Sequence, residues 1–153
     1  MRLNPFEDKK NEYDLREILT KEDLWVYEPK QEYKDLFGEF LSYEVLVKAI
    51  DTSIKWHILK TGSYQGDYWY IGEKDDKIYF IDIGYGSCSG CDSLLAREYD
   101  IDGLVELQDE IKRKIREFDN ILELVEWIHG SNEWWFDEKY EILGFINKEF
   151  DIL

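Results

Sequence analysis

The stretch DYWYIGEKDDKIYFIDI, residues 67–83, carries the clearest strand signal in the chain. Within it and at its edges, residues 66–73 and 77–83 are rich in β-branched and aromatic side chains, and the second segment alternates between two faces. Between these segments lie Asp75 and Asp76, residue types that favour a short turn. The stretch therefore predicts an antiparallel hairpin.

A third strand is expected immediately before the hairpin. Residues 54–59 have the same β-branched and aromatic character, and a polar loop separates them from residue 66. Pairing with the hairpin gives a three-stranded antiparallel meander whose two faces differ in polarity.

The segments on either side of the meander show helical spacing. A capping box that begins at Thr20 predicts a short helix over 21–28, ended by Pro29. Apolar residues recur every three or four positions over 32–50 and predict a second helix, with a strand over 45–50 as the alternative. After the glycine-rich corner, a short helix is expected over 94–99.

The strongest helical pattern lies near 103–129. Apolar residues line one face and charged residues the others, which predicts one long amphipathic helix, unless Asp119 and Asn120 split it. Asn132 is a candidate cap for a last helix. The predicted fold class is therefore α+β: a three-stranded antiparallel meander packed with several helices. A chain of 153 residues with 44% hydrophobic content fits one domain over 1–153.

The charge balance limits the partners. Lys and Arg number 19 and Asp and Glu 35, so the net charge is −16. So acidic a surface repels phosphate backbones and anionic lipid heads, which disfavours direct nucleic-acid or membrane binding. The same charge favours a partner protein with a basic surface. The first eight residues lack an apolar signal core, and no window offers the roughly 18 apolar residues that span a bilayer. We expect a cytoplasmic protein.

The segment GYGSCSGCD, residues 84–92, holds both cysteines of the chain. If the hairpin turns near residue 75, the far ends of its strands meet, and the loop 62–67 comes to lie beside this glycine-rich corner. Loops carried on rigid strands are common positions for function. The predicted ligand or partner cluster comprises Tyr64, Gln65, Asp67, Tyr85, Ser87 and Asp92, with Cys88 and Cys91 as a metal or disulfide pair.

Three interpretations of the cysteine pair stay open. A Cys-x-x-Cys spacing where a helix begins fits a dithiol redox site, because free amides lower a thiolate pKa. A zinc site would combine Cys88 and Cys91 with His57 and His129, although neither histidine has a local partner. The third interpretation is a structural corner, in which small residues permit a tight backbone and Asp92 caps the following helix.

The segments SYQGDYW and GYGSCSGCDSLL together resemble a group of small prokaryotic and viral proteins. These share a tyrosine-glycine turn and a Gly-Ser-Cys-Ser-x-Cys-Asp corner. The resemblance covers residues 63–95 and implies that five residues act together: Tyr64, Gly66, Cys88, Cys91 and Asp92. It implies no activity, and it points to a virus, plasmid or other mobile element as the source.

No sequence motif identifies a reaction. The chain lacks a phosphate-binding glycine loop with a following lysine, a metalloprotease helix and a Gly-x-Ser-x-Gly elbow. We therefore expect a non-enzymatic module that binds or inhibits a basic partner protein, with carboxylates standing where DNA phosphates would lie. The alternative is a thiol-redox or zinc protein that uses Cys88 and Cys91.

Overall fold

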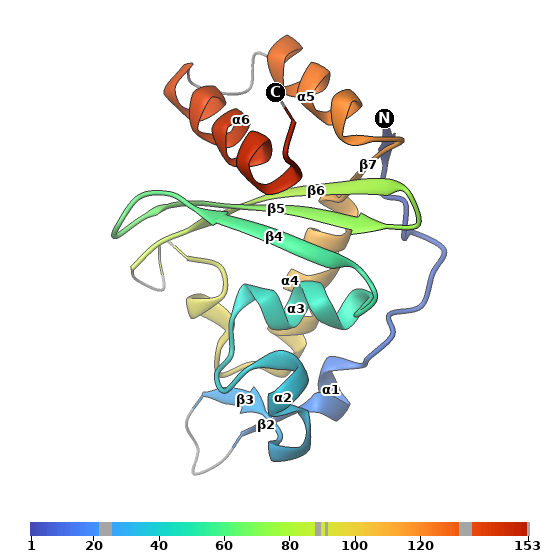
Figure 1. Cartoon of the computed structure of the whole chain (residues 1–153). Coiled ribbons are helices and arrows are strands. Elements are labelled where there is room, and N and C mark those ends of the chain that lie inside the picture. Colours follow the sequence, from blue (N-terminus) through green and yellow to red (C-terminus); the bar gives the residue numbers. More distant parts are fainter. Residues whose placement is uncertain (22–25, 88–89, 91, 132–135, 153) are drawn as a thin grey trace.

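A computed structural model of the chain describes residues 1–21, 26–87, 90, 92–131 and 136–152. The fold is α+β and has three layers. A five-stranded antiparallel sheet lies in the middle, two C-terminal helices cover one face, and the other described helices lie on the opposite side with a separate two-stranded sheet (Figure 1).

The predicted meander is present. Strands β4 (Lys55–Lys60), β5 (Gly66–Lys74) and β6 (Lys77–Tyr85) pair antiparallel in sequence order. The hairpin closes through Asp75 and Asp76, whose φ angles are +50° and +62°. Two positive φ angles in a two-residue loop match the right-handed twist of the paired strands.

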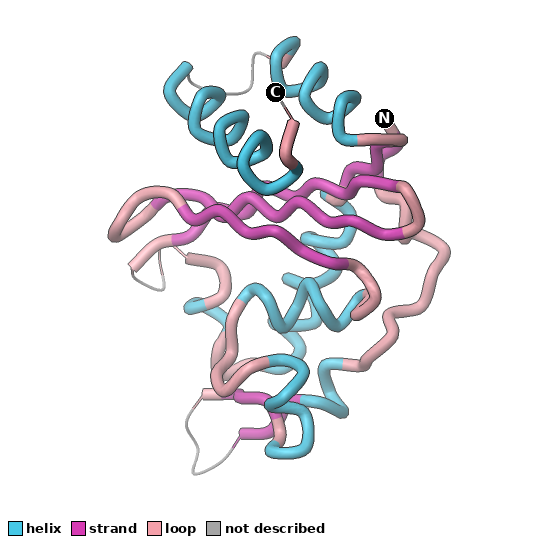
Figure 2. The backbone as a smooth tube through the Cα atoms, viewed as in Figure 1, coloured by secondary structure: helices cyan, strands magenta, loops and turns pink. Residues whose placement is uncertain are grey.

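The sheet is larger than the predicted three strands. Strand β7 (Arg116–Phe118) pairs with β6, and β1 (Arg2–Leu3) pairs with β7, which gives the order β1-β7-β6-β5-β4 (Figure 2). Both added strands are too short to leave an alternating pattern in the sequence. Their position follows from long-range pairing.

The single helix predicted near 103–129 is wrong. Helix α4 (Ile101–Lys114) ends where Ile115 adopts extended angles of φ −62° and ψ 131°, and α5 (Ile121–Gly130) begins after strand β7. The side chain of Asn120 caps α5 by accepting a hydrogen bond of 3.0 Å from the Glu123 amide. The alternative of a split near residues 119 and 120 is confirmed.

The N-terminal part is less helical than expected. Helix α1 (Leu15–Ile18) is followed by β2 (Leu19–Lys21), which pairs antiparallel with β3 (Tyr27–Pro29). The helix predicted over 21–28 is therefore wrong at Lys21 and from Tyr27 onward, because these residues form a β ladder. Residues 22–25 lie outside the described part.

The helix predicted over 32–50 is interrupted. A 3₁₀ turn, η1 (Gln31–Tyr33), leads into α2 (Lys34–Phe37), which ends at Gly38 with a φ of +95°. Glycine adopts positive φ without a Cβ clash and can therefore end α2 abruptly. Helix α3 (Tyr43–Ile50) then confirms a helix, and not a strand, for residues 45–50.

Two further helical segments complete the chain. The helix expected over 94–99 is only a 3₁₀ turn, η2 (Leu95–Arg97). Helix α6 (Phe136–Phe150) packs beside α5, whereas its predicted cap, Asn132, lies outside the described residues. Within the described residues, no helix combines the length and the apolar character needed to cross a membrane.

Each face of the sheet has its own core. Alternate residues of β5 and β6 point to opposite faces, so each strand contributes to both cores. The core on the side of α3 and α4 includes Val45, Leu46, Tyr70, Ile81, Leu104 and Ile111. The core on the side of α5 and α6 includes Trp69, Ile71, Phe80, Phe118, Leu124 and Ile142.

Candidate functional site

The hairpin register brings the two predicted loops together. Gly66 pairs with Tyr85 and Asp67 pairs with Gly84, so the loop before β5 lies beside the corner after β6. The Tyr85 hydroxyl donates a hydrogen bond to the Thr61 carbonyl and ties the two loops to each other. The juxtaposition expected from the sequence is present.

Asp92 holds the corner in shape. The residue is 8% exposed, and its carboxylate accepts hydrogen bonds from the Tyr43 hydroxyl (2.7 Å), the Gly86 amide (2.9 Å) and the Leu94 amide (2.9 Å). Such charge-assisted bonds compensate for the burial of a carboxylate. Burial, followed by the hydrogen bond to Asp92, raises the pKa of the Tyr43 hydroxyl. Asp92 therefore fastens the corner to helix α3.

A hollow of about 310 Å³ lies next to this corner, on the side of the sheet that carries α3 and α4; we call it the corner hollow. Four residues of the predicted cluster line it: Tyr64, Tyr85, Ser87 and Asp92. Tyr64 is 79% exposed. The exposed Gln65 is not among the lining residues.

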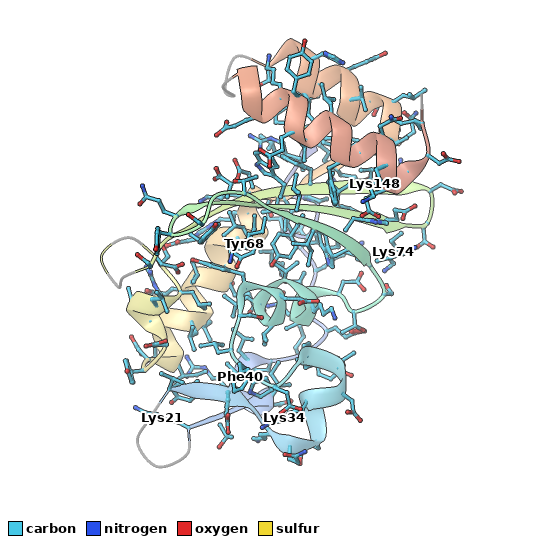
Figure 3. All side chains as sticks on the ribbon, turned by 60° about the vertical axis from the view of Figure 1, so that its left-hand side comes forward. Lys21, Lys34, Phe40, Tyr68, Lys74 and Lys148 are labelled. Atoms are coloured by element: carbon cyan, nitrogen blue, oxygen red, sulfur yellow. The ribbon has the colours of Figure 1, made fainter. Side chains whose placement is uncertain are left out.

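Lys60 and Tyr68 also line the corner hollow and were not predicted from the sequence. They are direct cross-strand partners in the β4–β5 register. The Lys60 ammonium lies 5.7 Å from the Tyr68 ring centroid and 4.9 Å from that of Tyr85. Figure 3 shows Tyr68 between the sheet and the helices on the α3 side. The predicted strand ended one residue before Lys60, so only the register reveals this contact.

Asp67 belongs to the opposite face of the sheet. Its carboxyl interacts with that of Asp82, which lies directly across from Trp69 on the side of α5 and α6. Partial loss of solvent, followed by the negative charge and a hydrogen bond of Asp67, raises the pKa of Asp82 to about 7. The register thus separates Asp67 from the predicted cluster members that line the corner hollow.

The cysteine interpretations fall outside the described residues, because both Cys88 and Cys91 do. Of the two histidines, His57 has its ring nitrogens 2.6 Å from a Glu73 oxygen and 3.3 Å from a Glu149 oxygen. His129 is exposed at the end of α5. Among the residues that the structure describes, no three His, Cys, Asp or Glu side chains are grouped to hold a metal ion.

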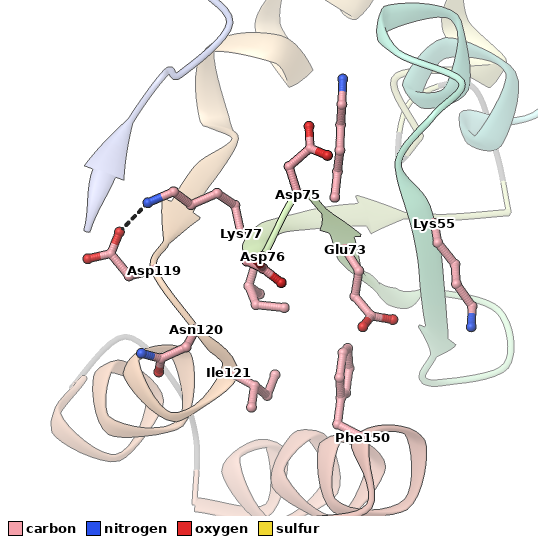
Figure 4. Close-up of a pocket in the computed structure, with 11 residues that line it drawn as sticks. Lys55, Glu73, Asp75, Asp76, Lys77, Asp119, Asn120, Ile121 and Phe150 are labelled. Atoms are coloured by element: carbon pink, nitrogen blue, oxygen red, sulfur yellow. Dashed lines mark hydrogen bonds and ion pairs between the residues drawn. The ribbon is translucent and has the colours of Figure 1, made fainter.

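A larger hollow, of about 640 Å³, lies at the turn of the β5–β6 hairpin (Figure 4). Several of its charged side chains are engaged in ion pairs. Lys77 lies 2.6 Å from Asp119, Lys74 lies 2.7 Å from Asp51, and Glu73 contacts His57. These pairs link the hairpin to the neighbouring elements, and we assign them a structural role.

Comparison of the chain with known proteins identifies no relative. No protein-family model, curated protein or solved structure gives a significant match to the chain.

Proposed function

We propose that the protein is a non-enzymatic interaction module that binds a basic surface of a partner protein. The observation that carries the proposal is an acidic ridge along α4. It consists of Glu106, Asp109 and Glu110, which lie together with Arg113 on one surface of the helix. On a helix, positions 106, 109 and 110 share one face, and the three carboxylates lie within roughly 6 Å along the axis.

Helix α4, which carries the ridge, is held in place by α1 and by the segment that precedes it. The Asn11 side chain donates to Gln108 (3.1 Å), and Gln108 in turn donates to the Leu46 carbonyl (2.9 Å). Arg16 forms an ion pair with Asp102. A preorganised charged surface loses less conformational entropy on binding than a mobile one, which favours its use as an interface.

The charge is also large enough to steer a partner. With a net charge of −16, the protein attracts basic proteins at long range, and the effect weakens as salt screens it. A DNA-binding protein presents a surface that meets a line of negative charges. We propose such a protein as the partner, which the acidic ridge would occupy in competition with DNA.

The test is a comparison of two variants that lose the same charge. One variant, E106Q/D109N/E110Q, neutralises the ridge, and the control, E32Q/D35N/E141Q, removes three charges elsewhere. A partner captured from a prokaryotic lysate at about 50 mM salt is purified, and its affinity for each form is measured as salt is raised. We expect at least a tenfold loss for the ridge variant and less than a threefold loss for the control.

Displacement of a labelled duplex from the purified partner provides the second readout. The parent protein should release the duplex, and the ridge variant should not. If both triple variants lose the same affinity for the partner, binding depends only on total charge, and the proposal that the ridge is the binding surface is refuted. The absence of any retained partner at low salt would refute the proposed function.

The sequence also leaves open a thiol or zinc protein that uses Cys88 and Cys91. Elemental analysis and thiol titration of freshly purified protein distinguish this alternative from a structural corner. One zinc per chain supports a metal site, and two exposed thiols of low pKa support redox chemistry. Two inert sulfurs support a structural corner.

A further inference from the structure

The corner hollow contains a lysine, Lys60, that forms no ion pair with any residue that the structure describes. Among the described residues, no carboxylate lies within ion-pair distance of the Lys60 ammonium, although the chain has 35 Asp and Glu residues. The ammonium lies near the rings of Tyr68 and Tyr85 at 5.7 and 4.9 Å. These cation–π contacts position the charge and do not neutralise it.

The carboxylate that lines the same hollow is already occupied. Asp92 accepts hydrogen bonds from Tyr43 and from the backbone amides of Gly86 and Leu94. With the Leu95 amide at 3.3 Å, four protein donors hold this carboxylate, and it is not within ion-pair distance of the Lys60 ammonium. The positive charge of Lys60 is therefore available to an anion that enters the hollow from outside.

The other lining groups fit a ring that carries such an anion. Tyr64 is 79% exposed, and no ring contact or hydrogen bond involves its side chain among the described residues. The hydroxyls of Ser63 and Ser87 likewise make no hydrogen bond within the described part of the chain. Aromatic faces stack on planar ligands, and free hydroxyls donate to anionic oxygens.

We propose that the corner hollow binds a small molecule made of one planar ring system with one anionic substituent, either a phosphate or a carboxylate. Lys60 pairs with the anion, Ser63 and Ser87 donate to its oxygens, and Tyr64 and Tyr68 contact the ring. The volume of about 310 Å³ lies at the small end of the range for ligand sites, which fits a single ring system. The site is independent of the acidic ridge.

The test uses four probes with the chain of 153 residues: phenyl phosphate, phenylacetate, inorganic phosphate and benzyl alcohol. Their affinities are measured by calorimetry, and the binding position by amide chemical shifts, in about 150 mM salt, where the Debye length of about 8 Å limits repulsion by the acidic surface. We expect saturable binding of one or both ring anions, with shifts at Lys60, Tyr64 and Ser87. The phosphate and carboxylate probes distinguish the two anions.

Matched variants assign the contacts. Lys60→Gln should weaken binding of the ring anions at least tenfold, and Lys55→Gln, at the other end of β4, should change it less than twofold. Tyr64→Ala should weaken the ring anions at least fivefold, and Tyr99→Ala, another exposed tyrosine, should not. Inorganic phosphate and benzyl alcohol should each bind at least tenfold more weakly than the better ring anion.

Three outcomes would overturn the proposal. One is the absence of saturable binding by both ring anions. Another is an equal effect of Lys60→Gln and Lys55→Gln, which would show only a general charge effect. The third is equal affinity for inorganic phosphate and phenyl phosphate, which would remove the role of the ring.

Discussion

Tyr43 of helix α3 and Asp92 of the corner are joined by a hydrogen bond of 2.7 Å across 49 positions of the chain. The same hydroxyl accepts a hydrogen bond of 3.1 Å from the Leu94 amide. One phenol oxygen therefore connects the helix layer to the loop that follows the central hairpin.

Removal of this hydroxyl should destabilise the protein. In Tyr43→Phe, the Asp92 carboxylate loses one of its buried donors, and the expected loss is about 1–3 kcal/mol. Urea unfolding followed by circular dichroism measures it. The control, Tyr64→Phe, removes a hydroxyl from a residue that is 79% exposed and should change stability by less than about 0.5 kcal/mol. Equal effects of the two substitutions would contradict the anchoring role of Tyr43.

The Asp67–Asp82 pair should make stability depend on pH. The pKa of Asp82 is raised from 3.8 to about 7, so the folded state binds more protons than the unfolded state between these values. The contribution of Asp82 to stability therefore falls as pH rises from about 4 to about 7. The free energy of unfolding of Asp82→Asn should therefore rise relative to that of the parent over this range. The expected gain is on the order of 1 kcal/mol, because solvent reaches Asp82 and screens the charge.

Asp119 offers a contrast of opposite sign. The hydrogen bond from Lys77 lowers the pKa of Asp119, so its contribution is present above its ordinary pKa and is lost as pH falls. Asp119→Asn should therefore be less stable than the parent at neutral pH, and the difference in stability should shrink in acid. Thermal unfolding at several pH values measures both variants. A constant difference in stability between Asp82→Asn and the parent across the range from about pH 4 to about pH 8 would refute the raised pKa of Asp82.

The central hairpin was predictable because its signals are local. The strands alternate in polarity, and the two aspartates between them, Asp75 and Asp76, occur at the positive φ angles of a tight turn. The strand over 27–29 was not predictable, because its ladder with residues 19–21 depends on a pairing that no local pattern announces. The break after α4 was predicted only as an alternative to one long helix. Ile115 and Phe118 keep the spacing of a buried helix face, although both are buried side chains on extended backbone.

The candidate site was predictable to the level of neighbouring loops. The register that joins Asp67 to Gly84 follows from the turn position, and it brought the two loops together. The cluster nevertheless mixed two faces, because consecutive strand residues point to opposite sides. Asp67 and Tyr68 are adjacent in sequence, yet the Asp67 carboxyl contacts Asp82 on one face of the sheet, and the Tyr68 ring lines the corner hollow on the other.

The separation of α4 from α5 depends on the cap of α5. Asn120→Ala removes the side chain that accepts from the Glu123 amide and should cost about 1 kcal/mol, measured by urea unfolding. Asn147→Ala replaces an exposed asparagine within α6 and should be neutral or slightly stabilising, because alanine has the higher helix propensity. A neutral result for Asn120→Ala would be inconsistent with a helix that begins at Ile121.

Two glycines should respond to alanine in opposite directions. A Cβ on Gly72 of β5 would lie 2.5 Å from Ile54 Cγ2 and 2.9 Å from ring atoms of Trp56, its cross-strand partner. Neither contact is with the end of a long flexible chain, so Gly72→Ala should cost about 1–3 kcal/mol. A Cβ on Gly144 of α6 would meet nothing within 4 Å, and Gly144→Ala should stabilise the helix by about 0.5–1 kcal/mol. A urea midpoint for Gly72→Ala that is unchanged or raised would contradict the close contact of Trp56 with Gly72.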